Sequence, residues 1–114
     1  MENYDFIAIG DTVTDAFIKL NHEGAHVDID HGEREICLRF GEKVPYLDVY
    51  VVPGVGNAAN AAVSASRLGL KTAFVSNIGD DDQGREILKV MREEKVNEEF
   101  IAIHKNQKTN YHYV

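Results

Sequence analysis

The segment Val52-Pro53-Gly54-Val55-Gly56-Asn57-Ala58-Ala59-Asn60-Ala61-Ala62 decides the fold of this chain. An apolar, β-rich run at residues 49–52 leads into it, and a run of small residues continues beyond it. This order predicts a strand, a glycine turn and a helix, with glycines that allow backbone angles and close approaches that a side chain would block. Because the first amides of a helix have no partner within the helix, the turn predicts a binding place for a polar or anionic ligand.

Buried strands and helices alternate around this turn. Residues 6–9, 72–77 and 100–103 are apolar runs typical of central strands in a parallel sheet. Helices are predicted at about residues 58–68, where Gly69 follows the end, and at about residues 83–94. Strand, helix, strand, helix and strand in succession predict an α/β fold with a right-handed parallel arrangement and helices flanking the sheet.

A second group of strands is predicted in the remaining segments. Residues 16–20, 46–52 and 111–114 predict a small sheet that stands off the main one, and residues 35–40 read as a half-exposed strand. Residues 21–32 are acidic, contain histidines and show little pattern, so we predict a loop there. The strand-like run that starts at Thr109 stops without a turn, from which we expect the chain to be the first part of a longer protein.

Composition narrows the class of protein. The 114 residues, 44% apolar and 27% charged, are ordinary for one globular domain. The net charge of −7 argues against nucleic acid and anionic membrane surfaces as partners. Cys37 is the one cysteine and cannot form an internal disulfide, and no apolar run is long enough to span a bilayer. We therefore expect a cytoplasmic protein.

Candidate ligand-binding residues follow strand ends. Asp11 and Asp15 come directly after the buried strand at residues 6–9, where open α/β sheets bind ligands, although Asp and Thr also serve as turn residues. Asn60 lies in the first turn of the predicted helix beside the glycines, so its amide is placed to face the same ligand.

The sequence also contains features of two other kinds of site. Gly54-Val55-Gly56-Asn57-Ala58-Ala59 fits G-x-G-x-x-A, the dinucleotide fingerprint, but Ser76 and Asn77 stand where that motif needs an acid for the ribose. A metal site is the other alternative. Its candidate ligands suit zinc in type but match no usual ligand spacing, so no metal site is predicted; they are His22, His26, His31 and Cys37, with Asp28 and Asp30 between them.

The spacing of residues 54–79 resembles the first signature of the ribokinase-like (PfkB) carbohydrate kinase family. That signature has a glycine pair, an Asn, a small residue two later, a Gly seven beyond that and another Gly ten further. The matching positions are Asn60, Ala62, Gly69 and Gly79. Residues 10–15 resemble the end of the family's first strand, with Asp15 in the place of its sugar-binding Asp, and Gly84 follows Gly79 as is common in the family. The family's adjacent glycines are split here by Val55.

The resemblance implies part of a three-layer ribokinase-like fold, with residues 1–114 as the N-terminal part of the kinase domain. It implies a small β lid formed by residues 12–20, 35–52 and 109–114 and inserted in the α/β core. In relatives the lid often also makes the dimer contact, so a homodimer through the lid is implied. The implied activity is transfer of the ATP γ-phosphate to a hydroxyl of a sugar or nucleoside.

The resemblance also implies roles for single residues. Asp11 and Asp15 would bind the sugar together with the Asn60 amide, and the lack of side chains at Gly54 and Gly56 would let the backbone approach it. ATP and Mg²⁺ are implied for the intact enzyme, but no D-T-x-G-A-G-D-like or N-x-x-E stretch that would bind them occurs here. We therefore predict no catalytic residue in these 114 residues, no activity of the chain alone, and an absent ATP-binding part. A non-catalytic carbohydrate-binding module on the same scaffold and a dinucleotide-binding domain are the alternatives.

Overall fold

The computed structural model describes residues 2–114, which form eight strands and two helices. In chain order these elements are β1 (Phe6–Ile9), β2 (Val13–Leu20), β3 (Ala25–Asp30), β4 (Glu33–Leu38), β5 (Tyr46–Val55), α1 (Asn57–Arg67), β6 (Thr72–Gly79), α2 (Asp82–Glu93), β7 (Ile101–His104) and β8 (Tyr111–Tyr113). Neither helix in the described part of the chain is long and apolar enough to cross a membrane.

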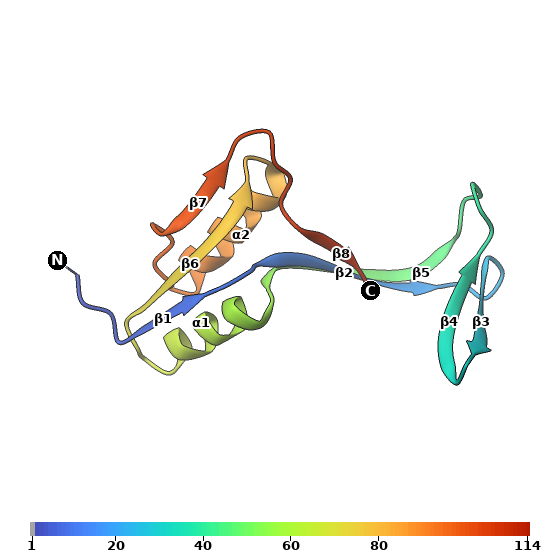
Figure 1. Ribbon diagram of the computed structural model, residues 1–114, viewed down its shortest axis with the longest axis horizontal. Helices are drawn as coiled ribbons and strands as arrows, with labels where there is room; N and C mark the ends of the chain where they lie inside the picture. The colour runs from blue at the N-terminus through green and yellow to red at the C-terminus, as the bar shows by residue number, and fades with distance from the viewer. Residues whose placement is uncertain (1) are drawn as a thin grey trace.

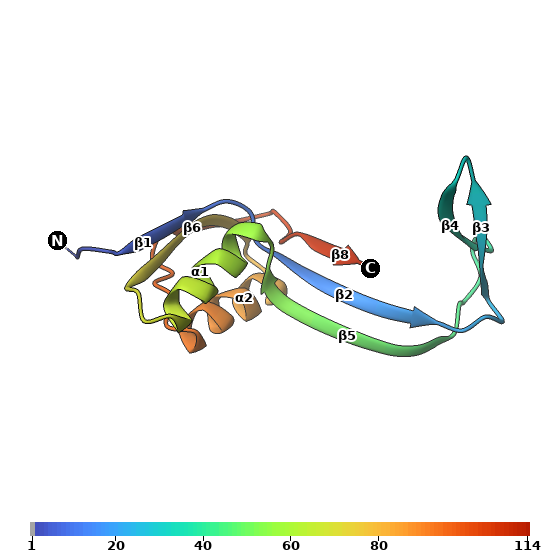
Figure 2. The same cartoon turned by 90° about the horizontal axis from the view of Figure 1, so that it is seen from below.

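The main sheet is parallel, in the order β1-β6-β7, as predicted from the three apolar runs. Both helices pack on one face of it, so these residues contribute two layers (Figure 2). The core between the layers contains Phe74 of β6 with Ile87 and Met91 of α2, all fully buried. Ile7 and Ile9 lie on the opposite face of the sheet and are exposed.

Helix α1 lies close to the sheet because its buried positions carry only alanine. Ala59 and Ala62 are fully buried against β1 and β6. Gly10, just after β1, faces this helix, and a Cβ added there would come within 2.8 Å of the Ala58 Cβ. The small-residue run that identified the helix therefore also sets its distance from the sheet.

The second sheet has the order β5-β2-β8 and extends away from the helices (Figure 1). Strand β2 pairs antiparallel with β5 and parallel with β8, which confirms the predicted small sheet. The chain passes from the main sheet into this one through residues 10–12, and it returns through the turn that joins β5 to α1. The two crossing points lie beside each other, because Thr12 Oγ1 donates a hydrogen bond of 3.4 Å to the Val55 carbonyl.

This second sheet rules out the dinucleotide-binding alternative. That fingerprint needs a strand, helix and strand in one parallel sheet. Here β5, which precedes the glycines, belongs to the second sheet, whereas β6, which follows α1, belongs to the main sheet. The G-x-G-x-x-A match is therefore a coincidence of spacing.

The prediction of a loop at residues 21–32 is wrong. Ala25–Asp30 forms β3 and pairs antiparallel with Glu33–Leu38, which forms β4 somewhat earlier than the predicted strand at 35–40. His31 and Gly32 form the two-residue turn and both have positive φ, 47° and 83°, as such hairpin turns require. The many acids hid a period-two alternation in which Val27 and Ile29 take one face.

Candidate functional site

The carboxyl ends of the main-sheet strands surround a polar cavity of about 420 Å³. Because β1, β6 and β7 are parallel, their carboxyl ends meet at one edge. The cavity is lined by Asp11, Asn77, Ile78, Gly79, His104, Gln107, Lys108, Thr109 and Asn110. Several donors and acceptors thus converge where open α/β sheets bind ligands.

Two hydrogen-bonded pairs organise this cavity. Asn110 Nδ2 donates to Asp11 Oδ2 across 3.4 Å, joining the loop before β8 to the end of β1. Asn77 Oδ1 lies 2.8 Å from His104 Nε2, joining the ends of β6 and β7. Carboxylate, amide and imidazole groups together can accept from and donate to several hydroxyls of a polar ligand. Sequence reasoning did not select Asn77, His104 or Asn110, because each becomes a neighbour of Asp11 or of another polar group only through strand pairing.

Asp15 lies within the second sheet, on its central strand. Its register partners are Val52 of β5 and His112 of β8, and Asp15 Oδ1 is 3.5 Å from His112 Nδ1. The carboxylate is half-buried, with 23% of the side chain exposed. His112 is a neighbour that the sequence did not predict, because β8 is distant in the chain and joins β2 only through parallel pairing.

The glycine turn packs tightly on both sides. Gly54 has a φ of 71°, and a Cβ added there would lie 3.1 Å from Val90 Cγ1 of α2. Gly56 has a φ of 115°, and its added Cβ would lie 3.3 Å from the Asp11 carbonyl oxygen. Residues other than glycine rarely adopt these backbone φ angles. Gly54 therefore lets β5 approach α2, and Gly56 brings the start of α1 against Asp11.

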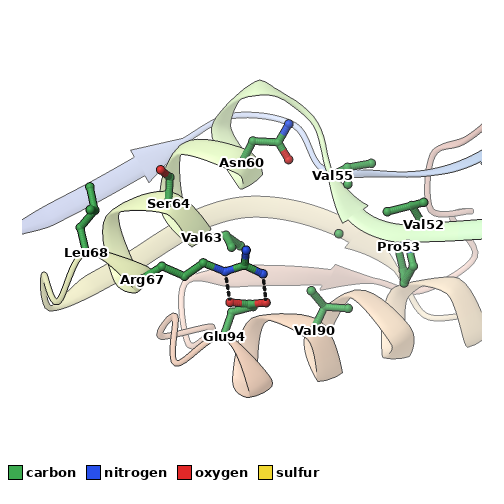
Figure 3. A pocket seen from close by; sticks show the side chains of 11 residues that line it. Val52, Pro53, Val55, Asn60, Val63, Ser64, Arg67, Leu68, Val90 and Glu94 are labelled. Atoms are coloured by element: carbon green, nitrogen blue, oxygen red, sulfur yellow. Dashed lines mark hydrogen bonds and ion pairs between the residues drawn. The ribbon is translucent and has the colours of Figure 1, made fainter.

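A second cavity, of about 500 Å³, lies between the two helices and β5. Asn60 and Gly54 line it, with Asn60 beside Val55 at the start of α1 (Figure 3). Farther along, Arg67 Nε donates to Glu94 Oε2 at 2.8 Å. Hydrogen bonding with Glu94, followed by its charge, raises the pKa of Arg67, and the same hydrogen bond lowers the pKa of Glu94. This pair connects α1 to the end of α2.

The predicted binding residues therefore fall into three neighbouring places. Gly56 and Asp11 are in contact, and Gly54 and Asn60 share the cavity between the helices. Asp15 lines neither of the two cavities described, as judged over residues 2–114. The structure does not bring Asp15 and Asn60 into one cavity.

Asp81 fixes the loop that carries Asn110. Its Oδ1 accepts from the Gly84 amide at 2.8 Å and caps α2. The same carboxylate accepts from the amide and the hydroxyl of Thr109, at 2.8 and 2.6 Å. Partial burial, the largest single influence, raises the pKa of Asp81. The hydrogen bonds from Thr109 and Gly84, with the charge of Arg85, outweigh it and hold the pKa below its ordinary value.

Replacing Asp81 with alanine should destabilise the chain at neutral pH by about 1–2 kcal/mol, since it removes an N-cap and the anchor of Thr109. Because the folded-state pKa is lowered, this stability is present above the unfolded-state pKa of about 4 and is lost as pH falls through the folded-state pKa. Urea unfolding of both proteins should therefore give free energies that converge in acid. Asp80→Ala is the control, since the Asp80 carboxylate makes, within residues 2–114, only an exposed ion pair with Arg85. A constant difference down to the lowest measurable pH would contradict this role.

The fold is that of the ribokinase-like kinases. Over 99% of the chain it matches the structure of Arabidopsis thaliana ribokinase complexed with ribose and ATP, with a TM-score of 0.79 at 17% identity. The chain covers 32% of that protein. The ribokinase-like α/β fold that the sequence predicted is thus confirmed, and these residues make up part of it.

Sequence comparisons identify the family. Residues 25–114 match the model of the pfkB family carbohydrate kinases, and the chain belongs to this family. It is 38% identical to the ribokinase of Dictyostelium discoideum over 68 residues, which are 60% of this chain and 21% of that protein. It is 44% identical to the 5-dehydro-2-deoxygluconokinase of Bacillus thuringiensis (strain Al Hakam) over 48 residues, 42% of this chain and 14% of that protein. The matches thus span about a seventh to a fifth of these curated relatives.

Proposed function

We propose that this chain is the sugar-binding and lid part of a cytoplasmic, ATP-dependent carbohydrate or nucleoside kinase. The intact enzyme would transfer the γ-phosphate of ATP to a hydroxyl group of its substrate. The observation that carries this proposal is the packing of Gly56 against Asp11 at the carboxyl edge of the main sheet. This contact brings the end of β1, the glycine turn and the second sheet together at one place. The chain in which it occurs belongs to a carbohydrate kinase family.

The predicted binding residues, although they lie in three neighbouring places, suit a polyhydroxyl ligand in their chemistry. A carboxylate can accept hydrogen bonds from two vicinal hydroxyls at once, as proposed for Asp11 and Asp15. The Asn60 amide can both donate and accept, and the glycine turn leaves room for the backbone of Gly54 and Gly56 to approach the ligand. His112, 3.5 Å from Asp15, holds that carboxylate at the β2–β8 side of the sheet.

The sheet β5-β2-β8 is the proposed lid. It leaves the core next to Asp11 and Gly56, so a movement there would cover or uncover a ligand at the carboxyl edge. Phe17 and Tyr50 are cross-strand partners on this sheet and are 43% and 66% exposed. We propose that such apolar side chains also form the contact of a homodimer. Sedimentation equilibrium that shows only monomers of the complete kinase would remove this part of the proposal.

The described residues do not fit the phosphates of ATP with Mg²⁺. The carboxyl-edge cavity contains one carboxylate, that of Asp11, and one cation, that of Lys108. Phosphoryl transfer needs several positioned donors and metal-binding oxygens around the phosphates. We therefore derive no step of the transfer from these residues and assign them only to substrate binding and closure.

The test is Asp15→Ala in the complete product of the gene. We expect the KM for the sugar to rise about ten- to a hundredfold, the loss typical of charge-assisted hydrogen bonds, while the KM for ATP changes little. Asp48→Ala is the matched control, because Asp48 is on the same sheet and, among the described residues, its carboxylate accepts only from the Val49 amide. An unchanged KM for the sugar, or a rise mainly in the KM for ATP, would remove Asp15 from the sugar site.

A further inference from the structure

The β3–β4 hairpin divides its side chains by chemistry. Residues directly opposite each other on antiparallel strands point to the same face, and that face changes with every step along the strand. One face carries the pairs His26–Cys37, Asp28–Glu35 and Asp30–Glu33. The other carries Ala25–Leu38, Val27–Ile36 and Ile29–Arg34. The first face thus consists entirely of imidazole, thiol and carboxylate groups, the side chains that bind transition metals.

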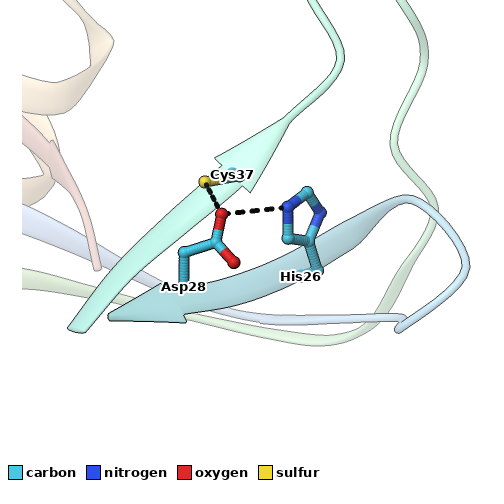
Figure 4. Close-up of side chains that lie close together, drawn as sticks. All are labelled: His26, Asp28 and Cys37. Atoms are coloured by element: carbon cyan, nitrogen blue, oxygen red, sulfur yellow. Dashed lines mark hydrogen bonds and ion pairs between the residues drawn. The ribbon is translucent and has the colours of Figure 1, made fainter. Parts of the chain in front are cut away.

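Three of these side chains converge on one point (Figure 4). Asp28 Oδ2 lies 3.4 Å from His26 Nε2 and 3.5 Å from Cys37 Sγ. One ligand atom from each of the three residues lies within 4.8 Å of the other two. In tetrahedral zinc sites, bonds of about 2.1 Å to nitrogen or oxygen and about 2.3 Å to sulfur place neighbouring N and O atoms ~3.3 Å apart and S and O atoms ~3.6 Å apart. Two of the three separations, from Asp28 Oδ2 to His26 Nε2 and from Asp28 Oδ2 to Cys37 Sγ, therefore already match those of such a site.

We propose that His26, Asp28 and Cys37 bind a zinc ion on this face of the hairpin. The mixed set of sulfur, nitrogen and oxygen ligands suits zinc better than Ca²⁺ or Mg²⁺, which take oxygen ligands. A thiolate and a carboxylate together balance the charge of the ion, and water or Glu35, opposite Asp28, can occupy the fourth position. Asp30 and Glu33 add negative charge along the same face, which favours a cation.

The site gives this hairpin a source of stability. Strands β3 and β4 form a two-stranded sheet of their own, and such a sheet is marginal in water without further packing. Its apolar face is open, with Val27, Ile29 and Ile36 each at least 59% exposed. An ion bound by both strands would hold them together, as metal binding does in other small units. The sequence spacing gave no sign of this, because the ligands meet through strand pairing. The proposal does not depend on the kinase function.

Cobalt titration of the 114-residue chain under reducing conditions tests the proposal, with Co²⁺ as a coloured substitute for zinc. We expect saturable binding of one ion, intense visible bands of tetrahedral cobalt and a near-ultraviolet thiolate-to-cobalt band, all reversed by added Zn²⁺. Cys37→Ser should abolish the thiolate band, and both Cys37→Ser and His26→Ala should weaken binding at least about tenfold. His31→Ala is the matched control and should bind as the parent does, since His31 lies in the turn and contacts Asp30.

Amide spectra of residues outside the hairpin establish that each variant keeps its core. The proposal is overturned if the parent chain shows no saturable binding or no thiolate band. It is equally overturned if a variant with an intact core, Cys37→Ser or His26→Ala, binds Co²⁺ as tightly as the parent chain.

Discussion

Replacing Gly79 with alanine is expected to destabilise the chain by about 3 kcal/mol or more, or to prevent folding. A Cβ at Gly79 would overlap the Gln107 carbonyl and lie 2.8 Å from the Thr109 nitrogen. These are backbone atoms, which cannot turn aside as a side chain can. The Gly79 amide also donates to Thr109 Oγ1 at 3.0 Å, so displacement of the loop would break this bond. Urea unfolding followed by circular dichroism measures the loss.

Gly41→Ala is the control for this substitution. Gly41 has a φ of 73°, but a Cβ added there meets no atom within 4 Å, so only backbone strain of about 1 kcal/mol is expected. Gly84→Ala should resemble Gly79→Ala, because its Cβ would overlap the Gly79 carbonyl. Equal stability losses at Gly41 and Gly79 would show that the loop yields and that the close packing is not what requires glycine.

The second large effect concerns catalysis. We expect the 114-residue chain alone to show no phosphoryl transfer. General-base help contributes ~10²–10⁴-fold, and positioning of the phosphates contributes a larger share of the rate. A D-T-x-G-A-G-D-like stretch would supply the general base and position the phosphates, but none occurs in these residues. A coupled assay of ADP release, run on the chain and on the complete product of its gene, measures this difference directly.

The two sheets could be predicted because their strands have clear patterns. The run Phe6–Ile9 is continuously apolar, which predicts a strand of a parallel sheet, and Thr72–Gly79 is mostly buried. Strands β2 and β5 were recognised from their β-rich composition, and their placement in a separate sheet followed from their position between the core strands. The spacing of the glycines indicated the protein family, and the match to the family model confirmed it.

The sequence did not predict the β3–β4 hairpin, because neither face of its strands is buried in the core. All of its residues except Ala25 and Cys37 are exposed, so the alternation of Val27 and Ile29 with acids does not mark a core face. Five acids and three histidines between residues 22 and 35 resemble a solvated loop in composition. The convergence of His26, Asp28 and Cys37, on which the zinc proposal rests, becomes visible only when the strand register is known.

The neighbours of the predicted binding residues could not be derived from the sequence either. Asn110 reaches Asp11 and His112 reaches Asp15 across about a hundred residues of chain, through a loop anchored by Asp81. The roles of the glycines were only partly visible. The sequence predicted that Gly54 and Gly56 permit close approach, and the structure shows that α2 approaches Gly54 and the end of β1 approaches Gly56.

The most direct test of the central claim is ADP release by the complete gene product with a panel of pentoses, hexoses and nucleosides. We predict that at least one of these substrates strongly stimulates ADP release over the rate with ATP alone, and that the 114-residue chain releases none under the same conditions. Turnover by the chain comparable to that of the complete product would place the catalytic base within these residues, for example at Asp11 or Asp80. If no sugar or nucleoside stimulates ADP release by the complete product, the proposal of a carbohydrate kinase is contradicted.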